Sequence, residues 1–431
     1  MGSRVVDLVG VGFGPANVAL AVAIAEHNAR AERDADRVEA SFVERQDRFG
    51  WHRGALLDGA TMRTPFLTDL VTPRNPASEY SFVSFLHAHD RLGAFGELGT
   101  AYPLRQEFHA YLEWVAGRFA AQVAYGHTAV DVVPGGDVVD VVTRHAGGTR
   151  VLRARAVVVA AGLVPSLPAG VTPSARVWHN AGLALHAARL APGDPRRFVV
   201  AGAGQGAAES VAYLHRRFPA AEVCWLPFPA GGAPDDGFAG RPFAPEAVDT
   251  FFGAPADVKR MLLDHHGTTN HAGVETELVR ALRRSSYAGR VTGEDRLRLL
   301  EAARVTSVDD RGGGVTATVE FLASGDVVPL DADAVVFATG LRPADPTAVL
   351  GATAALCRRD DEGRLLVDHD YRVVTDDALT AGVYLQGGTE HVHGVTASLL
   401  SSVALRAGDI LDSVVAAVAD RRPARTDRRT A

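Results

Sequence analysis

The sequence predicts an α/β protein with two Rossmann-like dinucleotide-binding domains and a smaller substrate-lining region. Two stretches carry this prediction, "VDLVGVGFGPANVALA" at residues 6–21 and "VVAGAGQGAAES" at residues 199–210. Each stretch runs from a valine-rich strand through a glycine turn into a helix, which is the order of a dinucleotide fingerprint. The length of 431 residues agrees with two or three domains.

The first glycine turn contains Gly10, Gly12 and Gly14, and Pro15 follows it. Glycine permits the tight turn and lets the backbone approach a pyrophosphate, and proline suits the first helical position. The helix N-terminus then offers free N–H groups to phosphate. The next strand, "EASFVERQ", includes Glu44, which is placed to accept hydrogen bonds from a ribose hydroxyl. All five residues are therefore predicted to bind a cofactor.

The second glycine turn repeats this order with Gly202, Gly204, Gln205 and Gly206, which we also assign to cofactor binding. Ala207 stands where the third small residue of the fingerprint belongs. The following strand, "AEVCWLP", ends in neither an acidic nor a basic residue. The sequence therefore leaves open whether the ribose carries a 2′-phosphate, and hence whether NADPH or NADH binds.

Two later strands resemble each other, "RARAVVVAAGLVPSLP" at 153–168 and "DADAVVFATGLRPADP" at 331–346. Each ends in a turn of small residues and a proline, as expected where a chain returns to a nucleotide domain after an excursion. We assign Thr339 and Gly340 in the second of these turns to cofactor binding. Near the C-terminus, residues 381–415 predict a strand, a glycine turn and a long helix.

These elements predict two bound dinucleotides, one in each Rossmann-like unit. The usual pairing is a flavin that stays bound and a nicotinamide that visits. We expect the flavin domain over residues 1–165 and 330–431, interrupted by a nicotinamide domain over 170–328. Segment 48–120 is rich in aromatic residues and is expected to line the substrate cleft.

The net charge of −7 argues against nucleic acid or an anionic membrane as a partner. The two cysteines share no CxxC spacing, which excludes a redox dithiol of that type and suits a reducing cytoplasm. No apolar run approaches the ~20 residues of a membrane-spanning helix, and no signal peptide is visible. His391 and His393 have no evident third ligand, so we expect no metal site.

Several blocks in order resemble the microbial N-hydroxylating flavoprotein monooxygenases, which include L-ornithine and L-lysine N-monooxygenases and related diamine hydroxylases. The resemblance rests on the two glycine turns and on four further blocks: "FGWHRGALLDGATMRTPFLTDLVTPRNP", "TTNHAGVETELV", "ATGLRP" and "EHVHGVTASLLSSVALRAGDI". The block around "MRTPFLTDLVTPRNP" is far more specific than a glycine pattern.

The resemblance implies FAD, a nicotinamide coenzyme (NADPH, with NADH possible as well), O2 and a primary amine. In this family the reduced flavin forms a C4a-hydroperoxide, whose distal oxygen passes to the neutral amine to give a hydroxylamine. The product serves siderophore or other natural-product biosynthesis. The resemblance also implies a homo-oligomer, and the low cysteine content leads us to expect a cytoplasmic protein. The alternatives are an NAD(P)H oxidase and a flavin-binding redox protein, neither of which would hydroxylate an amine.

The chain departs from the family at the substrate positions. Ornithine and lysine enzymes carry a lysine where this sequence has Thr68, and a glutamine where it has Arg63. Their asparagine after the "DD" is replaced here near Arg241, whereas Asn270 is retained. The substrate is then a diamine without a carboxylate, or an amine whose anion, a carboxylate or phosphonate, meets an arginine. Alternatively, Arg63 contacts only the flavin or a backbone carbonyl and Arg241 is solvated.

The resemblance adds further site residues. Trp51 and His52 match the family's "WH", either packing near the flavin or contacting it. Ser398 is expected at the start of the last helix, where the family contacts substrate, with helix capping as the alternative. Leu399 is assigned to the cofactor, and Thr68 and Asn270 to the substrate. Arg63 is assigned to both.

Overall fold

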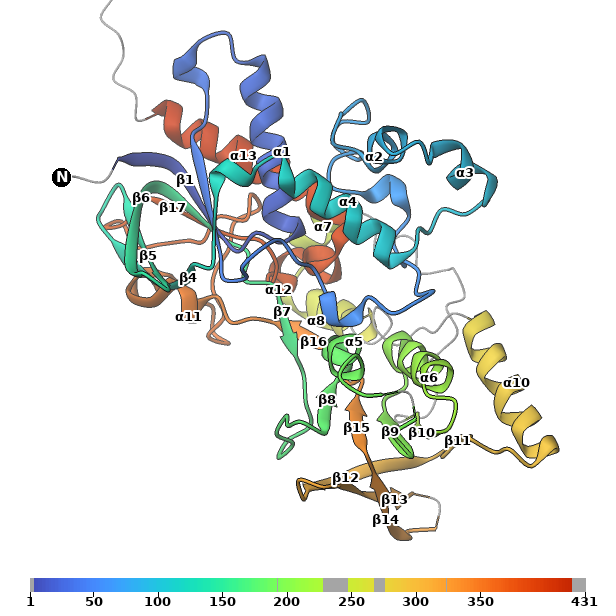
Figure 1. Ribbon diagram of the computed structural model, residues 1–431. Coiled ribbons are helices and arrows are strands. Elements are labelled where there is room, and N and C mark those ends of the chain that lie inside the picture. The colour runs from blue at the N-terminus through green and yellow to red at the C-terminus, as the bar shows by residue number, and fades with distance from the viewer. Residues whose placement is uncertain (1–3, 192, 228–246, 267–275, 323, 421–431) are drawn as a thin grey trace, which may run out of the picture.

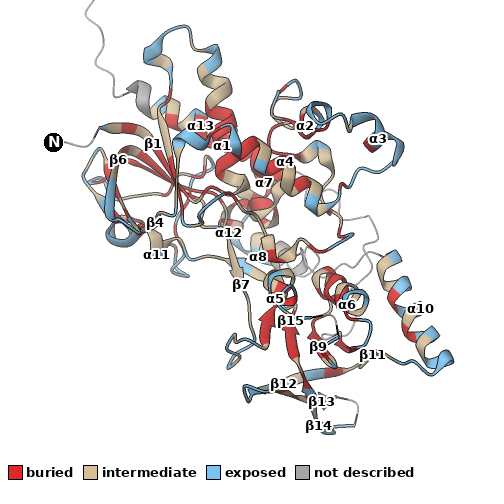
Figure 2. Ribbon diagram, in the orientation of Figure 1, coloured by how far each residue is buried: buried red, intermediate tan, exposed pale blue. Residues whose placement is uncertain are grey.

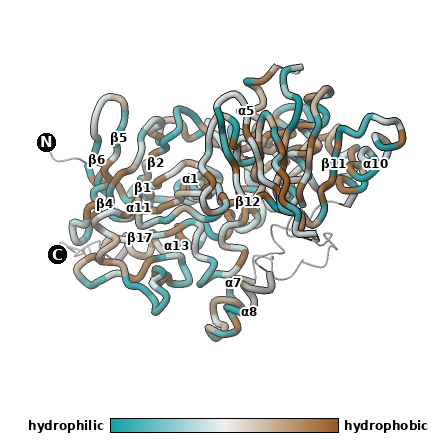
Figure 3. Tube along the Cα trace, turned by 90° about the horizontal axis from the view of Figure 1, so that it is seen from below, coloured by the Kyte–Doolittle hydropathy of each residue, from teal (hydrophilic) through white to brown (hydrophobic). Residues whose placement is uncertain are grey.

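The computed structural model describes residues 4–191, 193–227, 247–266, 276–322 and 324–420. Two sheets, one mixed and one parallel, organise the chain into two lobes, which lie one above the other in Figure 1 and side by side in Figure 3. The first lobe is built on the sheet that contains the N-terminal strand, and the second lobe on the sheet that contains the strand before the second glycine turn. This arrangement confirms the predicted α/β fold.

The sheet of the first lobe has the order β3-β2-β1-β6-β5-β4, with β17 also paired to β6. Strands β1, β2, β3 and β17 run parallel with the end of β6, whereas β4, β5 and β6 form antiparallel hairpins. The strands are β1 (Val5–Val11), β2 (Ala40–Glu44), β3 (Val123–Tyr125), β4 (Thr128–Pro134), β5 (Val139–His145), β6 (Gly148–Val159) and β17 (Gly382–Leu385).

Helices cover one face of this sheet, where α1 lies against α13 (Figure 1). Buried side chains of these two helices join those of the helices before β3 in one apolar cluster. Figure 2 shows the buried residues in red along the strands and in α1. The helices are α1 (Pro15–Arg30), α2 (Phe82–Ala88), α3 (Leu92–Glu97), α4 (Arg105–Gly117), α11 (Thr347–Leu350), α12 (Glu390–His393) and α13 (Val403–Asp420).

The sheet of the second lobe has the order β11-β10-β9-β15-β8, and its strands are all parallel. An antiparallel sheet of β12, β13 and β14 packs beside it. The elements are β8 (Val177–His179), α5 (Leu183–Ala187), β9 (Arg197–Ala201), α6 (Gln205–Arg217), β10 (Glu222–Leu226), α10 (Thr276–Thr292), β11 (Leu297–Leu299), β12 (Ala303–Asp310), β13 (Val315–Phe321), β14 (Val327–Ala332) and β15 (Ala334–Phe337).

The chain passes between the lobes at β7 (Leu163–Pro165) and returns at β16 (Leu341–Pro343), and these strands pair with each other in antiparallel fashion (Figure 1). Strand β15 therefore lies in the second sheet, although the boundary expected at residue 330 assigns it to the flavin domain. A valine-rich strand of this kind has the same pattern in either sheet, so its sequence could not decide between them.

Helices α7 (Ala247–Phe252) and α8 (Ala256–His266) come from the middle of the chain but contact α12 of the first lobe. Phe252 lies against His393, with ring centroids 5.8 Å apart. The expected nicotinamide domain of residues 170–328 therefore includes a part that packs on the first lobe. None of the helices in the described ranges is long and apolar enough to span a bilayer.

Candidate functional site

The first glycine turn is closed by backbone packing. Gly12 has φ +83°, and a Cβ atom there would lie 2.4 Å from the carbonyl oxygen of Ala160. A Cβ on Gly10 would lie 2.4 Å from the ring of Phe42. Both positions therefore require glycine for close approach to the neighbouring strands.

Gly14 differs from these two glycines because no atom lies within 4 Å of a Cβ built on it. It is the N-cap of α1, and no side chain caps that helix end. The first-turn N–H groups of α1 therefore border open space, next to a turn in which Gly12 and Gly14 carry no side chain and Phe13 is buried. This arrangement fits the pyrophosphate of a dinucleotide such as FAD.

Glu44 is only 6% exposed at the end of β2. Its carboxylate accepts hydrogen bonds from the N–H groups of Phe13 (2.7 Å) and Gln46 (2.9 Å). The acid thus braces the glycine turn, a role that the sequence analysis did not include. A carboxylate oxygen can accept more than one hydrogen bond, so the predicted ribose contact is compatible with this geometry.

A buried polar chain joins the first glycine turn to the C-terminal segment. The amide of Asn17 donates to the carbonyl of Gly12 (2.6 Å), and its oxygen accepts from Gln386 (3.1 Å). Arg406 in α13 donates to Gln386 (3.5 Å), to Ser402 (3.3 Å) and to the carbonyl of Ala397. Burial lowers the pKa of this guanidinium.

Asn17, Gln386 and Arg406 were not among the site residues predicted from the sequence. A signal was present for Arg406, because a single arginine interrupts the apolar start of the C-terminal helix. Such a residue needs buried acceptors, and those acceptors come from a loop that the sequence pattern does not place.

The loop between β17 and α13 contains Ser398 and Leu399. Ser398 donates to Glu390 and accepts from the N–H of Gly388 (3.3 Å). The expectation that Ser398 begins the last helix is wrong, because α13 begins at Val403 and residues 395–398 form a separate 3-10 turn. Ser398 instead links two parts of this loop, residues 388–390 and residue 398, by hydrogen bonds. Its substrate contact and the cofactor contact of Leu399 stay predictions.

His391 and His393 each place one ring nitrogen against a backbone carbonyl, of Leu365 (2.9 Å) and His369 (3.2 Å) respectively. His393 is fully buried and stacks on Tyr371, with ring centroids 4.0 Å apart. Burial lowers the pKa of His393 to about 4, so its imidazole is neutral near pH 7. Both rings thus have structural partners in the segment 365–371.

The second glycine turn repeats the geometry of the first. Gly202 has φ +141°, and a Cβ there would lie 2.4 Å from the carbonyl oxygen of Ala338. Gly204 is the N-cap of α6, again without a side-chain cap. The indole N–H of Trp225 donates to the carbonyl of Gly202 (2.8 Å). The uncapped helix end fits the pyrophosphate of a second dinucleotide.

Thr339 and Gly340 lie at the crossing between the lobes. The hydroxyl of Thr339 donates to the carbonyl of Ser166. The carbonyl of Gly340 accepts from the ring of His179 (2.9 Å) and from the N–H of Ser166 (3.0 Å). These bonds hold the paired strands β7 and β16 together, and the predicted cofactor contacts of both residues stay untested.

Trp51 and His52 lie beside one another, with ring centroids 4.8 Å apart. His52 adopts a left-handed backbone conformation with φ +47°, which is uncommon for a non-glycine residue. Burial, followed by the positive charge of Arg105, lowers the pKa of His52 to about 4. A neutral, strained histidine in this position is typical of a functional site.

Arg63 and Thr68 lie in the loop before α2. Arg63 is exposed, whereas the hydroxyl of Thr68 donates to the carbonyl of Pro65 (2.8 Å) within a 3-10 turn. The next residue, Asp69, is fully buried and accepts from the N–H of Phe82 (2.6 Å) and of Thr72 (2.7 Å). This anchor fixes the loop that carries the two substituted positions. Arg241 and Asn270 lie outside the described residues.

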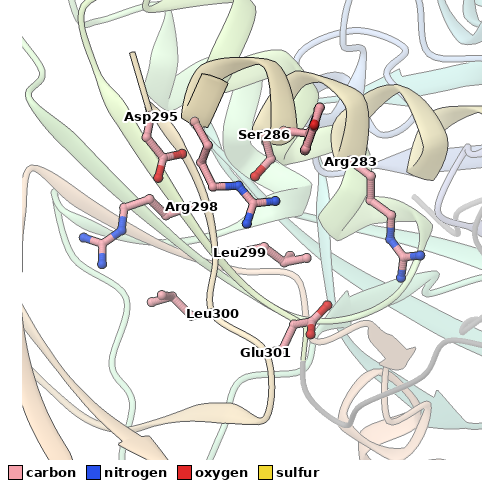
Figure 4. A pocket seen from close by; sticks show the side chains of 9 residues that line it. Arg283, Ser286, Asp295, Arg298, Leu299, Leu300 and Glu301 are labelled. Carbon is pink, nitrogen blue, oxygen red and sulfur yellow. The ribbon is translucent and has the colours of Figure 1, made fainter. Parts of the chain in front are cut away.

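A cavity of about 550 Å³ lies between α10 and β11, at the outer edge of the second sheet (Figure 4). Its lining includes Arg283, Arg298 and Glu301, and it contains none of the predicted site residues. The candidate site is therefore the region of the two uncapped helix ends and the loops beside them.

Two glycine turns of this geometry, in two connected lobes, define a class of two-dinucleotide flavoprotein oxidoreductases. Residues 4–343 match the family model described as L-lysine 6-monooxygenase/L-ornithine 5-monooxygenase. The chain belongs to this family of flavin-dependent N-monooxygenases, and it is an oxidoreductase that uses FAD, NADPH and O2. The predicted family, enzyme class and cofactors are confirmed.

Individual relatives agree over nearly the whole length. The chain is 38% identical to an L-ornithine N(5)-monooxygenase of Burkholderia cepacia, over 90% of each chain. It is similar to the ornithine N-hydroxylase of Kutzneria sp. 744 with a TM-score of 0.90 and 41% identity, covering 95% of this chain and 99% of that one. The ornithine hydroxylase of Pseudomonas aeruginosa gives a TM-score of 0.87 at 31% identity, covering 96% and 100%.

Proposed function

We propose that this enzyme hydroxylates the nitrogen of a primary amine. The substrate is not ornithine bound through its carboxylate to a lysine. The single observation that carries the proposal is the position of Thr68. Its hydroxyl donates to the carbonyl of Pro65 in its own turn. The resemblance to ornithine enzymes implies a lysine at this position, which would hold the substrate carboxylate. Thr68 therefore offers no cation to a substrate carboxylate.

Arg63 supplies a cation five residues earlier on the same loop, which Asp69 anchors. A guanidinium binds a carboxylate or a phosphonate with two parallel hydrogen bonds. We therefore favour two substrate classes, an amine whose anion meets Arg63 and a diamine that has no anion. The relatives named above act on L-ornithine, which carries its carboxylate at the far end from the reacting nitrogen.

The uncapped N-terminus of α1, braced by Glu44 and Asn17, would hold the FAD pyrophosphate, and that of α6 would hold NADPH. Bound FAD supplies the oxygen-activating redox chemistry, and NADPH supplies the electrons. The chain's own part is to hold both groups and the amine in register. Because the amine reacts in its neutral form, we expect the rate to rise with pH above neutrality.

The buried, free state of Cys224 and Cys357 agrees with a reducing compartment, and we place the reaction in the cytoplasm. The product would enter siderophore or other natural-product assembly. The expected homo-oligomer stays a prediction.

The test is a product assay with purified enzyme, FAD, NADPH and O2. The amine panel is ornithine, lysine, putrescine, cadaverine, aspartate and aminophosphonates, and the hydroxylamine is detected by mass. We expect product from a diamine or an anionic amine, and little from ornithine. In the double variant Arg63→Gln/Thr68→Lys, we expect ornithine turnover to rise by about tenfold or more, as for a restored buried ion pair.

Thr68→Gln serves as the matched control, because it lengthens the same side chain without a charge. Efficient ornithine hydroxylation by the unaltered enzyme would refute the substrate assignment. Hydrogen peroxide as the sole product across the panel, including the ornithine-restored variant, would instead identify an NAD(P)H oxidase.

A further inference from the structure

The two lobes share a packed interface formed by residues 53–61 of the first lobe. Leu57 and Ala60 are 4% and 8% exposed and belong to the apolar core of the second lobe, with Trp178 and Phe198. A Cβ on Gly54 would lie 2.2 Å from the carbonyl oxygen of Ala181. The interface is therefore close enough to transmit small displacements from one lobe to the other.

A two-pronged ion pair crosses this interface. The Nη1 and Nη2 atoms of Arg105, the first residue of α4, each lie 2.9 Å from one carboxylate oxygen of Glu209 in α6. The same guanidinium donates to the carbonyls of Ala55 (3.1 Å) and Thr61 (3.3 Å) at the two ends of the interface segment. The side chains are only 16% and 8% exposed, so solvent screens the pair weakly.

The pair continues into the second glycine turn. The side-chain amide of Gln205 donates to Oε1 of Glu209 (3.0 Å). Gln205 is the first residue of α6 and follows Gly204 directly. One line of hydrogen bonds thus runs from the first lobe, through Arg105 and Glu209, to the helix end that offers N–H groups to the nicotinamide nucleotide.

We propose that Arg105 and Glu209 are positioning residues that hold the nicotinamide turn, through Gln205, in register with the flavin site. This inference rests on the proposed binding of FAD by the first turn and of NADPH by the second. A displacement of about 1 Å at a reacting centre can cost about 100-fold in rate. The Arg105–Glu209 pair joins the two lobes directly, so its loss would allow such a displacement of one lobe relative to the other.

The decisive variant is Glu209→Gln, which keeps the shape of the side chain and removes its charge. We expect the KM for NADPH to rise about tenfold, because an unpaired buried arginine no longer holds α6. The hydroxylamine formed per NADPH oxidised should fall below half of the unaltered ratio, with hydrogen peroxide as the balance. Bound FAD and the KM for the amine should stay within a factor of about two, since neither depends on α6.

Arg216→Ala is the matched control. Arg216 lies at the other end of α6 and also crosses the interface, donating to the carbonyl of Asp58 (2.7 Å), but it has no link to Gln205. We expect an unchanged KM for NADPH and an unchanged product ratio. A second variant, Arg105→Met/Glu209→Leu, replaces the pair by apolar side chains and tests whether a restored Tm also restores NADPH use.

We expect the apolar pair to recover Tm but not the KM for NADPH or the product ratio. Recovery of all three by the apolar pair would overturn the inference, as would an unaltered KM and ratio in Glu209→Gln. Failure of the proposed function looks different, because it is observed in the unaltered enzyme, which would then hydroxylate ornithine efficiently or form no hydroxylamine from any amine.

Discussion

The two glycine turns have the same glycine geometry and the same uncapped helix end, but different hydrogen bonds support them. In both, a glycine with positive φ approaches a carbonyl just beyond a parallel strand, Ala160 for Gly12 and Ala338 for Gly202, and a Cβ would come within 2.4 Å. In both, the helix that follows begins without a side-chain cap. The resemblance noted between residues 153–168 and 331–346 has its physical cause here, because these two strands supply the two carbonyls.

The difference lies in the source of the supporting bonds. The first turn is braced from its own lobe by Glu44, Asn17 and the buried chain that ends at Arg406. The second turn is held in its own lobe by Trp225 and is braced in addition, through Gln205 and Glu209, by Arg105 of the other lobe. FAD stays bound, so its turn must keep its shape without help from the other lobe. NADPH binds and leaves, so its turn must be aligned with the flavin site.

The largest expected effect comes from a Cβ at the two matching glycines. Gly12→Ala should yield protein without bound FAD, and Gly202→Ala should keep FAD but lose reduction by NADPH. Each substitution adds about 1–3 kcal/mol of backbone strain as well as the carbonyl contact. Visible flavin absorbance and anaerobic reduction measure the two outcomes.

Gly14→Ala is the control for this pair, since its Cβ would meet no protein atom within 4 Å. We expect near-normal stability but weaker FAD binding, because the methyl group would enter the open space at the helix end. The comparison of the turns fails if Gly12→Ala retains FAD as well as Gly202→Ala does.

The second effect is on stability at acid pH, where two histidines with lowered pKa values, His52 and His393, become protonated. Burial lowers the folded-state pKa of both His52 and His393 from 6.5 to about 4. Their neutral forms therefore stabilise the fold above pH 6.5, and this contribution is lost as the pH falls towards 4. For His393, the loss amounts to about 3 kcal/mol.

Urea denaturation at several pH values measures this loss. His393→Phe keeps a ring against Tyr371 and should flatten the acid slope of the unfolding free energy. The exposed His87 offers the control variant His87→Gln, which removes an imidazole from the surface. An undiminished acid slope in His393→Phe would show that folding does not lower the pKa of this histidine.

The third effect concerns the buried chain behind the first turn. Arg406→Met leaves Gln386, Ser402 and the carbonyl of Ala397 without their donor, at about 1–3 kcal/mol. We expect a lower Tm and faster FAD loss, with an unchanged KM for NADPH in the protein that retains flavin. A raised KM for NADPH would show that Arg406 also affects the position of the second turn. It would contradict the difference drawn here between the supports of the two turns.

The smallest effect is a difference in labelling between the two cysteines. Burial raises the pKa of Cys224 in the second lobe to about 11 and also raises the pKa of Cys357 in the first. Both should resist thiol reagents in the native enzyme. In mild denaturant with FAD bound, we expect Cys224 to be labelled a few-fold faster, because its lobe depends on the interface. Faster labelling of Cys357 would contradict this order.

Local pattern was sufficient for both strand–turn–helix units, for the strand that ends at Glu44 and for the C-terminal helix. It was insufficient where a partner distant in sequence decides the structure. Arg105 and Glu209 are 104 residues apart, and neither "PLRQEF" nor "GAAES" shows that the two will meet. The antiparallel strands β12–β14 likewise escaped prediction, because their register depends on pairing rather than on a motif.

The paired strands β7 and β16 have a consequence for grafting one lobe onto a relative. The chain leaves and re-enters the first lobe at adjacent positions, so by connectivity the segment between them, which carries the second lobe and also α7 and α8, is a cassette that a short loop could replace. Its core, however, is completed by Leu57 and Ala60 from outside the cassette. A transplanted second lobe must therefore bring residues 53–61 with it. Since the loop with Arg63 and Thr68 follows this segment directly, coenzyme preference and the sequence of that loop should be inherited together when such proteins recombine.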